Sequence, residues 1–256
     1  MKNIYFIPFD RGADFTGAYK GVYRILESLQ KEEIPKDSYL FDIIEDKELI
    51  KKNGKIDSLC KVQKKIETIL KNKEQLLIVS GDHSVTFFLY QIVTGFFGTN
   101  LPLIILDAHS DASLEYEGWI NHGCFVRTLY KICNPEIYHI GVRYDPMKLK
   151  DIEQHTFPSF SFCNADANMI ESIKSLVGDR KCYVSIDIDV LDPVDCPGVF
   201  FPVLGGINES ELFKILEELF SLNVAAVDLV EYVPEKDIRE RTLSHAINII
   251  KKWLER

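Results

Sequence analysis

The chain has 256 residues, of which 46% are hydrophobic and 27% charged, a composition typical of folded globular proteins rather than disordered or fibrous ones. Asp and Glu number 39 against 30 Lys and Arg, and the resulting formal charge of −9 repels phosphate backbones, which argues against nucleic-acid binding. The length suits one α/β domain that spans residues 1–256.

We find no sequence signal for export or for membrane insertion. The chain begins MKNIYFIPFD, with no apolar h-region and cleavage site, and no apolar stretch reaches the length of a membrane span. The six cysteines form no C-x-x-C pair and lie mostly in apolar runs, which favours reduced thiols. We therefore expect a cytoplasmic protein that binds neither nucleic acid nor membranes.

Short β-rich runs alternate with amphipathic helical patterns along the whole chain. The runs that predict strands are 4–9, 39–43, 76–80, 102–107, 136–141, 182–189 and 225–230. Helices are predicted at 19–32, 56–72, 84–96, 123–132, 165–177, 209–221 and 237–254. One of these begins at Asn208, and Glu211 three residues later predicts a capping box. The alternation predicts an α/β fold, a three-layer α/β/α sandwich with a mostly parallel sheet of seven or eight strands.

Three polar clusters follow predicted strands, at the edge where open parallel sheets bind ligands. They read SGDHS (80–84), DAHSD (107–111) and SIDID (185–189). Because side chains alternate along a strand, we expect carboxylates spaced two residues apart to point to the same side. The candidate metal ligands are His83, Asp107, His109, Asp111, Asp187 and Asp189.

The crowding of four carboxylates at the ends of buried strands requires compensation. They would repel one another and be costly to desolvate unless cations lay between them. Mixed carboxylate and imidazole ligation without thiolate suits Mn²⁺ and, less well, Zn²⁺ or Fe²⁺, and six ligands suffice for two bridged ions. We therefore predict two Mn²⁺ per chain. A single Asp at a strand end is commonly only a cap or turn residue, but three such clusters in order make that alternative a poor explanation.

The three clusters resemble the metal motifs GGDHS, DAHxD and SxDxDxxDP of the ureohydrolase family, which includes arginases, agmatinases and formimidoylglutamases. The segments PFDRGADFTGAYKGVYRI (8–25), IGVR (140–143) and DLVEYVP (228–234) also resemble family segments and follow the family order. The resemblance implies an arginase-like fold, two manganese ions bridged by Asp107 and Asp187, and a homo-oligomer.

The same resemblance implies a reaction. A hydroxide held between the two ions, and oriented by Asp111, would attack the carbon of a guanidinium and release urea and a primary amine. His122 in NHGCF resembles the histidine that gives the leaving amine its proton, and Glu231 resembles the glutamate that pairs with the guanidinium. Taken alone, His122 could merely cap a helix, and Glu231 could be an ordinary surface carboxylate.

Two segments depart from the family pattern and bear on the substrate. PGVFFP replaces the family's PGTGTP, so Phe200 and Phe201 would narrow, dry or close the entrance, and Phe201 is a candidate substrate contact. The loop after Asp111, ASLEYEGWIN, lacks the Asn and Ser pattern with which arginases hold an amino-acid carboxylate. Glu115 and Trp119 on this loop suit a cationic or extended substrate such as agmatine, another guanidino compound or arginine in a peptide.

Two alternative functions stay open. The first is a formimidoyl or amide hydrolase of the same fold, as the related single-zinc deacetylases are, and the complete set of six ligands counts against it. The second is a non-catalytic metal-binding homologue whose pocket is closed by Phe200 and Phe201. A metal-binding scaffold needs neither His122 nor Glu231, so their presence argues for an enzyme.

Overall fold

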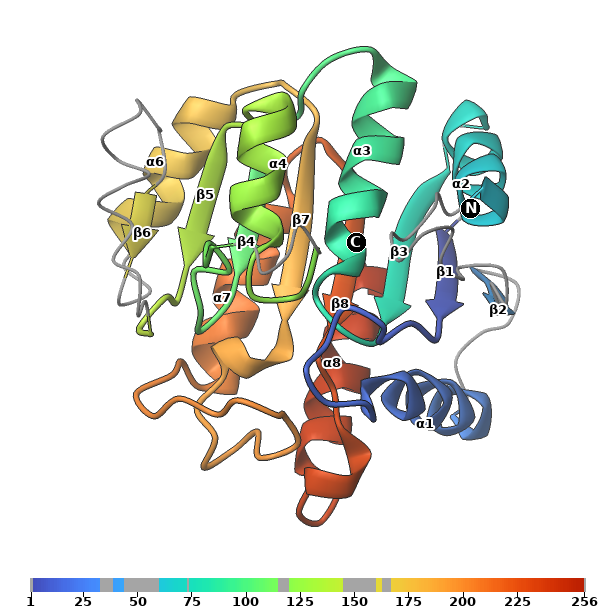
Figure 1. Cartoon of the computed structure of the whole chain (residues 1–256), viewed down its shortest axis with the longest axis vertical. Helices are drawn as coiled ribbons and strands as arrows, with labels where there is room; N and C mark the ends of the chain where they lie inside the picture. The colour runs from blue at the N-terminus through green and yellow to red at the C-terminus, as the bar shows by residue number, and fades with distance from the viewer. Residues whose placement is uncertain are drawn as a thin grey trace.

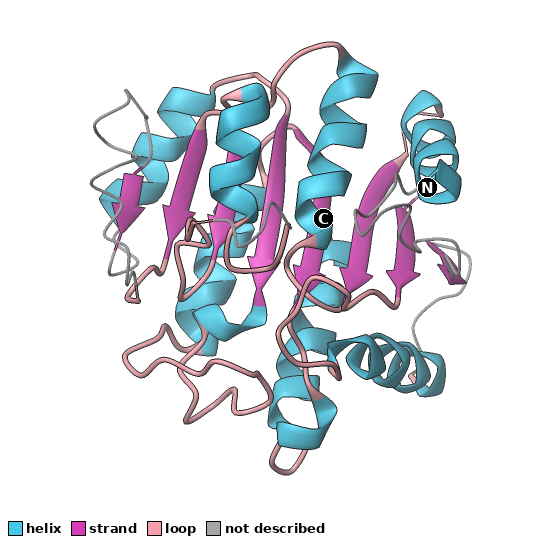
Figure 2. Cartoon of the chain, viewed as in Figure 1, coloured by secondary structure: helices cyan, strands magenta, loops and turns pink. Residues whose placement is uncertain are grey.

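The computed structural model describes residues 2–32, 39–43, 60–72, 74–114, 120–144, 160–162 and 167–255. Eight strands form one sheet in the order β2-β1-β3-β8-β7-β4-β5-β6, and every neighbouring pair is parallel (Figures 1 and 2). The strands are β1 (Lys2–Ile7), β2 (Tyr39–Ile43), β3 (Gln75–Ser80), β4 (Leu103–Leu106), β5 (Ile137–Ile140), β6 (Phe160–Phe162), β7 (Cys182–Asp187) and β8 (Val224–Val230).

Helices cover both faces of this sheet, which confirms the predicted α/β/α sandwich (Figure 1). One layer consists of α2 (Cys60–Lys71), α3 (Val85–Phe97) and α4 (Phe125–Cys133). The other consists of α1 (Ala18–Lys31), α6 (Ala167–Val177), α7 (Glu209–Phe220) and α8 (Arg241–Glu255). None of the described helices is long and apolar enough to cross a membrane.

The sheet is buried on both faces, so its strands must be apolar at consecutive positions rather than at every second one. In β3, for example, Leu77 and Val79 pack with the α1, α6, α7 and α8 layer, whereas Leu76 and Ile78 pack with the α2, α3 and α4 layer. Two hydrophobic cores result, one on each side of the sheet. This arrangement explains why the strands read as continuous apolar runs in the sequence.

The predicted elements are confirmed with small shifts of their ends, and three points differ. The short strand β6 falls at 160–162, which was not predicted as a strand. β4 ends at Leu106, and β7 ends at Asp187, where the 3-10 helix η2 (Ile188–Val190) begins. The prediction that strand alternation aligns the carboxylates is therefore wrong for Asp189, because turns that follow the strands orient these side chains. The capping box of α7 is confirmed, with Asn208 and Glu211 bonded reciprocally.

The strand order places the ends of β3, β8, β7 and β4 side by side in the middle of the sheet. All eight strands run in the same direction, so their carboxyl ends share one edge, at the bottom of Figure 1. β3 and β4 follow each other in the chain but are separated in the sheet by β8 and β7. The polar segments after these four strands consequently meet at one place, as ligand sites in open α/β sheets do.

Candidate active site

The turn between β3 and α3 places His83 at the centre of this edge, fully buried. A side chain at Gly81 would lie 1.9 Å from the carbonyl oxygen of Phe9, so only glycine fits there. The carboxylate of Asp82 accepts hydrogen bonds from the backbone N–H of Gly12 (3.0 Å) and of Ser84 (2.8 Å). The turn is therefore anchored to the loop after β1, and His83 has little freedom to move.

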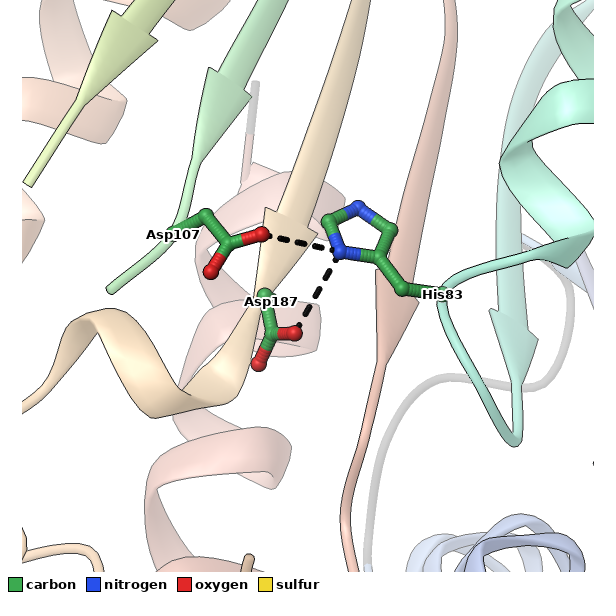
Figure 3. Close-up of side chains that lie close together, drawn as sticks. All are labelled: His83, Asp107 and Asp187. Carbon is green, nitrogen blue, oxygen red and sulfur yellow. Dashed lines mark ion pairs between the residues drawn. The ribbon is translucent and has the colours of Figure 1, made fainter. Parts of the chain in front are cut away.

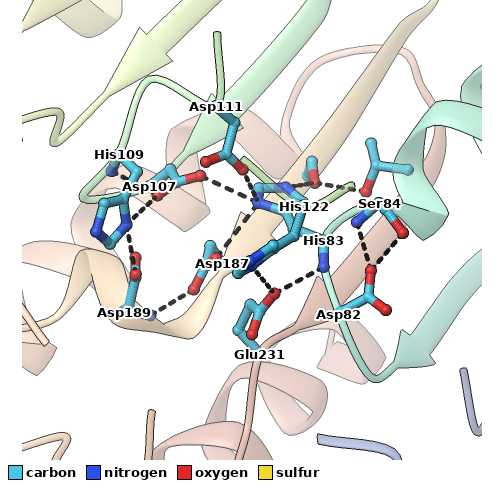
Figure 4. A network of polar contacts seen from close by, with 12 residues as sticks. Asp82, His83, Ser84, Asp107, His109, Asp111, His122, Asp187, Asp189 and Glu231 are labelled. Atoms are coloured by element: carbon cyan, nitrogen blue, oxygen red, sulfur yellow. Dashed lines mark hydrogen bonds and ion pairs between the residues drawn. The ribbon is translucent and has the colours of Figure 1, made fainter. Parts of the chain in front are cut away.

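Three carboxylates surround one nitrogen of His83: Asp107 and Asp187 (Figure 3), together with Asp111 (Figure 4). Its Nδ1 lies 3.0 Å from Asp107 Oδ2, 3.1 Å from Asp111 Oδ2 and 3.3 Å from Asp187 Oδ2. A single N–H cannot serve three oxygens, and neither Nδ1 nor Asp107 Oδ2 has a well-oriented hydrogen bond within the described residues, although both are buried. His83, Asp107 and Asp187 form a group of ligand atoms that could hold a metal ion.

A second group of ligand atoms adjoins the first. His109 Nδ1 lies 2.8 Å from Asp189 Oδ2 and 3.4 Å from Asp107 Oδ1. Asp107, His109 and Asp189 could hold a second metal ion, so Asp107 belongs to both groups. Its two oxygens face different histidines, which is the arrangement expected of a carboxylate that bridges two ions.

Backbone hydrogen bonds fix the carboxylates from behind (Figure 4). Asp107 Oδ1 accepts from the N–H of His109 at 2.6 Å, and Asp187 Oδ1 accepts from the N–H of Asp189 at 2.8 Å. Asp189 Oδ1 accepts from the N–H of Ala108 at 3.0 Å, which ties the turn after β7 to the turn after β4. Asp111 has a left-handed backbone with φ of 46°, so its place at the site also comes from a turn rather than from strand alternation.

Burial, repulsion between carboxylates and hydrogen bonds between carboxylates and histidines shift the pKa values of these groups. Burial, together with the charge of Asp107, raises the pKa of Asp111 to about 7. Burial, together with the charges of Asp189 and Asp107, raises the pKa of Asp187 well above its ordinary value. Burial alone would lower the pKa of His109, but hydrogen bonds to Asp107 and Asp189 outweigh it and raise that pKa to about 12. Four carboxylates with two imidazoles thus form a strongly cation-attracting pocket.

A series of buried, hydrogen-bonded side chains lies behind His83, and we did not predict it from the sequence. His83 Nε2 is 2.8 Å from the hydroxyl of Ser185, which donates to Asp228 Oδ1 at 2.5 Å. Asp228 Oδ2 also accepts from Thr86 (2.9 Å) and from Tyr183 (2.7 Å). Such a series fixes the ring orientation and leaves Nδ1 directed at the carboxylates. The available signal was that Ser185 and Asp228 belong to the same motifs as Asp187 and Glu231.

His122 and Glu231 lie together beside the first group. His122 Nδ1 is 3.4 Å from Glu231 Oε1, which also accepts the N–H of His83 at 2.8 Å. Glu231 is 5% exposed and holds a left-handed backbone with φ of 70°, so it is not a surface carboxylate. Cys124 is the N-cap of α4, and His122 therefore does not cap it. Burial lowers the pKa of His122, but the hydrogen bond to Glu231 outweighs it and raises the pKa to about 9.

A cavity of about 260 Å³ opens over both groups of ligand atoms. Phe200 and Phe201 form part of its wall and do not fill it, and Phe201 is 39% exposed. Glu115 and Trp119, which we predicted as substrate contacts, lie outside the described residues. The described lining comprises Asp14, His109, Ser110, Asp111, Ser113, His122, Gly123, Tyr144, Asp187, Asp189, Val199, Phe200, Phe201 and Glu231.

Comparison with known proteins agrees with this geometry. The family model described as "Arginase family" matches residues 3–254. The chain belongs to the arginase family. It is 31% identical over 215 residues to an agmatinase from Blochmanniella floridana, a match that covers 78% of the chain and 66% of that relative. An agmatinase from Escherichia coli O9:H4 is 30% identical over 204 residues, with 76% of the chain and 63% of the relative covered. The matched part is thus slightly under two thirds of each of these arginase-family relatives.

Solved structures of arginase-family proteins share the fold. The arginase from Bacillus subtilis superimposes with a TM-score of 0.82 at 23% identity, and the match covers 100% of the chain and 98% of the arginase. The proclavaminate amidino hydrolase from Streptomyces clavuligerus gives 0.81 at 25% identity, with 98% and 90% covered. The family assignment confirms the predicted resemblance to the ureohydrolases, and the superpositions confirm the arginase-like fold.

Proposed function

We propose that this arginase-family chain is a binuclear manganese hydrolase that cleaves a guanidino group to urea and a primary amine. The observation that carries the proposal is the shared carboxylate of Asp107, which joins two groups of ligand atoms under a cavity that also exposes His122 and Glu231. A metal-storage site needs two ligand groups but has no use for a histidine and a buried carboxylate beside them.

The donor set fits two divalent cations. His83, Asp111, Asp107 and Asp187 would hold one, and His109, Asp189 and the bridging pair Asp107 and Asp187 the other. Oxygen and imidazole donors without thiolate favour Mn²⁺ over softer metals. When bound, two such cations would supply electrostatic activation of water near neutral pH. Asp111 would orient that water by accepting a hydrogen bond from it.

Glu231 supplies the contact that distinguishes a guanidinium from a neutral amide. Its buried carboxylate faces the cavity between His83 and His122, and an ionised carboxylate pairs strongly with a planar cation that donates two parallel hydrogen bonds. We infer that this pairing places the guanidinium carbon over the two groups of ligand atoms.

His122 supplies the proton that the leaving group needs. In the reaction, the oxygen of water bonds to the guanidinium carbon and the bond from that carbon to the substituted nitrogen breaks. The departing amine gains a proton as it leaves, and the other product is neutral urea. The His122 ring lies at the cavity wall with its Nδ1 paired to Glu231, an interaction that favours the protonated ring. From there it can donate a proton to the amine and regain one from water.

The names of the relatives support an agmatine-like substrate. Both curated relatives quoted above are agmatinases, and the S. clavuligerus protein is named for hydrolysis of an amidino group. Agmatine, another guanidino compound or arginine in a peptide are the candidates. The homo-oligomeric state and the cytoplasmic location stay predictions from the sequence.

The test is release of urea by the Mn²⁺-loaded protein from agmatine, guanidinobutyrate, guanidinopropionate, arginine and an arginine-containing peptide. Asp189→Ala is the control, since it removes a ligand of the second group only. Urea from at least one compound, abolished in the control, is the expected result. No urea from any of them, together with hydrolysis of a formimidoyl or amide compound, would replace the proposal with the alternative hydrolase.

A further inference from the structure

We propose that Asp14 determines substrate specificity by binding the cationic far end of the guanidino substrate, while an aromatic wall formed by Phe15, Phe200 and Phe201 packs against its alkyl chain. The inference rests on the proposed guanidino hydrolysis. It narrows the substrate class to guanidines that carry a second positive charge.

Asp14 lies at the cavity rim, on the loop between β1 and α1. Its Oδ2 is 3.8 Å from His122 Nε2, whereas Nδ1 of the same ring is 3.4 Å from Glu231 Oε1. The histidine ring therefore separates two carboxylates, with Glu231 buried at depth and the Asp14 side chain 72% exposed at the mouth. A molecule with a cation at each end can pair with both at once.

The aromatic wall provides the apolar path between these two carboxylates. The Phe15 ring lies 5.6 Å from that of Phe200 and 5.9 Å from that of Phe201, and the Phe201 ring lies 5.4 Å from that of His122. Phe200 and Phe201 line the cavity, whereas Phe15 lies outside the described lining and extends their aromatic surface outward, with 56% of its surface exposed. A chain of methylene groups would cover this surface.

The loop is built to bring Phe15 and Asp14 to this place. The backbone N–H of Gly17 donates to Asp10 Oδ2 at 2.8 Å, which anchors the end of the loop to buried structure. Gly17 has φ of 151°, and a side chain there would lie 3.2 Å from the Phe200 ring. Glycine thus allows the loop to approach the Phe200 segment closely.

The charges around the cavity favour a cationic tail over a carboxylate tail. Among the described lining residues there is no Lys or Arg, and the charged side chains outside the metal-ligand groups are Asp14, Glu231 and His122. Lys236 lies nearby, with its Nζ 5.5 Å from the centre of the Phe200 ring, but it is not part of the lining. A substrate carboxylate at the rim would meet Asp14 and be repelled.

The test compares three substrates that differ only at the far end: agmatine with a cationic tail, butylguanidine with a neutral tail and guanidinobutyrate with an anionic tail. In Asp14→Asn we expect KM for agmatine to rise about twofold to fivefold, as for loss of an exposed ion pair. We expect KM for butylguanidine to stay unchanged and KM for guanidinobutyrate to fall. Asp179→Asn, an exposed site at the amino end of β7, makes the same charge change far from the cavity and should alter none of the three.

Phe201→Ala tests the wall separately. Because it removes apolar contact and no charge, KM for agmatine and for butylguanidine should rise by the same factor. Lys236→Gln tests the general electrostatic field near the rim, because it removes a positive charge there. KM changes in Lys236→Gln that equal those in Asp14→Asn with opposite sign would assign the selectivity to this field and would overturn the role of Asp14.

Two other outcomes would also overturn the inference. Equal KM changes for all three substrates would show that Asp14 does not contact the tail. A fall in kcat with all three, accompanied by a shifted pH profile, would make Asp14 a positioning residue for His122. If the unmodified protein released no urea from any substrate, the proposed function itself would be overturned. Activity of Asp14→Asn on butylguanidine serves as the control that this variant is folded.

Discussion

The floor of the cavity and its rim differ in what holds their side chains. The floor comprises the six candidate metal ligands and Glu231, which follow β3, β4, β7 and β8 and are mostly buried. Backbone N–H groups donate hydrogen bonds to its carboxylates, as they do to Asp107 and Asp187. The rim residues Asp14 and Phe201 lie on loops and are more than a third exposed. Parallel strands bring the floor together, whereas contacts between loops determine the rim.

The difference indicates which part of the site would control the chemistry and which would control the choice of substrate. A change on the floor disturbs buried charges that compensate one another, so its effect on the chemistry should be large. A change on the rim alters an exposed contact, so its effect should be small and should depend on the substrate. The following predictions can break this division or sharpen it.

Asp107→Asn should have the largest effect, because Asp107 belongs to both groups of ligand atoms. We expect urea release to fall by at least about a thousandfold, as loss of several kcal/mol of charge stabilisation requires. Steady-state assays at saturating Mn²⁺ measure the effect, with Asp179→Asn as the control. Activity within tenfold of the unmodified protein would show that Asp107 does not bridge two ions.

His122→Asn should lower kcat by about a hundredfold to a thousandfold through loss of proton donation to the amine. The unmodified protein should lose activity as the pH rises, because His122 then loses the proton that it donates. The pKa of His122 is raised to about 9, and bound cations would lower it, so the loss should occur at or below pH 9. Rate profiles against pH, with metal content measured in parallel, should show this alkaline limb absent in the variant. An unchanged limb would assign the proton transfer to another group.

Asp228→Asn should weaken metal binding about tenfold to a hundredfold, the usual cost of losing a partner behind a ligating histidine. The amide would present N–H donors to hydroxyls of Ser185 and Tyr183 that now donate to Asp228. Titration of the metal-free protein with Mn²⁺ measures the change. Lower thermal stability with unchanged Mn²⁺ affinity would mean that the buried series is only structural.

Arg143→Lys should have the smallest effect on catalysis, because Arg143 does not line the cavity and only connects the segment of Asp189 with that of Val203 from outside. Arg143 donates to the carbonyl oxygens of Asp189 and Val203, each at 2.8 Å, and Lys cannot reproduce this fork. We expect a loss of about 1–3 kcal/mol in the free energy of unfolding. Denaturant titration measures it, and the exposed Arg239→Lys is the control. Equal stability of both variants would contradict the role of Arg143.

The layers of the fold and the membership of the floor were predictable from the sequence. Strand runs and polar clusters at strand ends are local patterns, and parallel strands bring their carboxyl ends to one edge. The orientation of Asp189 and Asp111 was not predictable from alternation, because the chain leaves β7 in a 3-10 turn and adopts a left-handed conformation at Asp111. Turn geometry depends on contacts such as that between Asp189 and Ala108, which join distant segments.

The rim was harder to predict for the same reason. Asp14 and Phe15 lie in a segment whose motif indicated the family. This motif did not indicate that Phe15 approaches Phe200, because the two residues are 185 positions apart in the chain. The structure does show that Phe200 and Phe201 line the cavity instead of closing it. Contacts between loops have no periodicity in the sequence, so only the folded chain reveals them.

Metal content tests the central claim most directly. Elemental analysis of protein reloaded with Mn²⁺, with binding followed by titration, should give two ions per chain. Asp189→Ala should reduce this to one, because Asp189 is a candidate ligand only in the group of His109. One ion per chain in the unmodified protein, or loss of both ions in Asp189→Ala at saturating Mn²⁺, would contradict two cation sites that share Asp107.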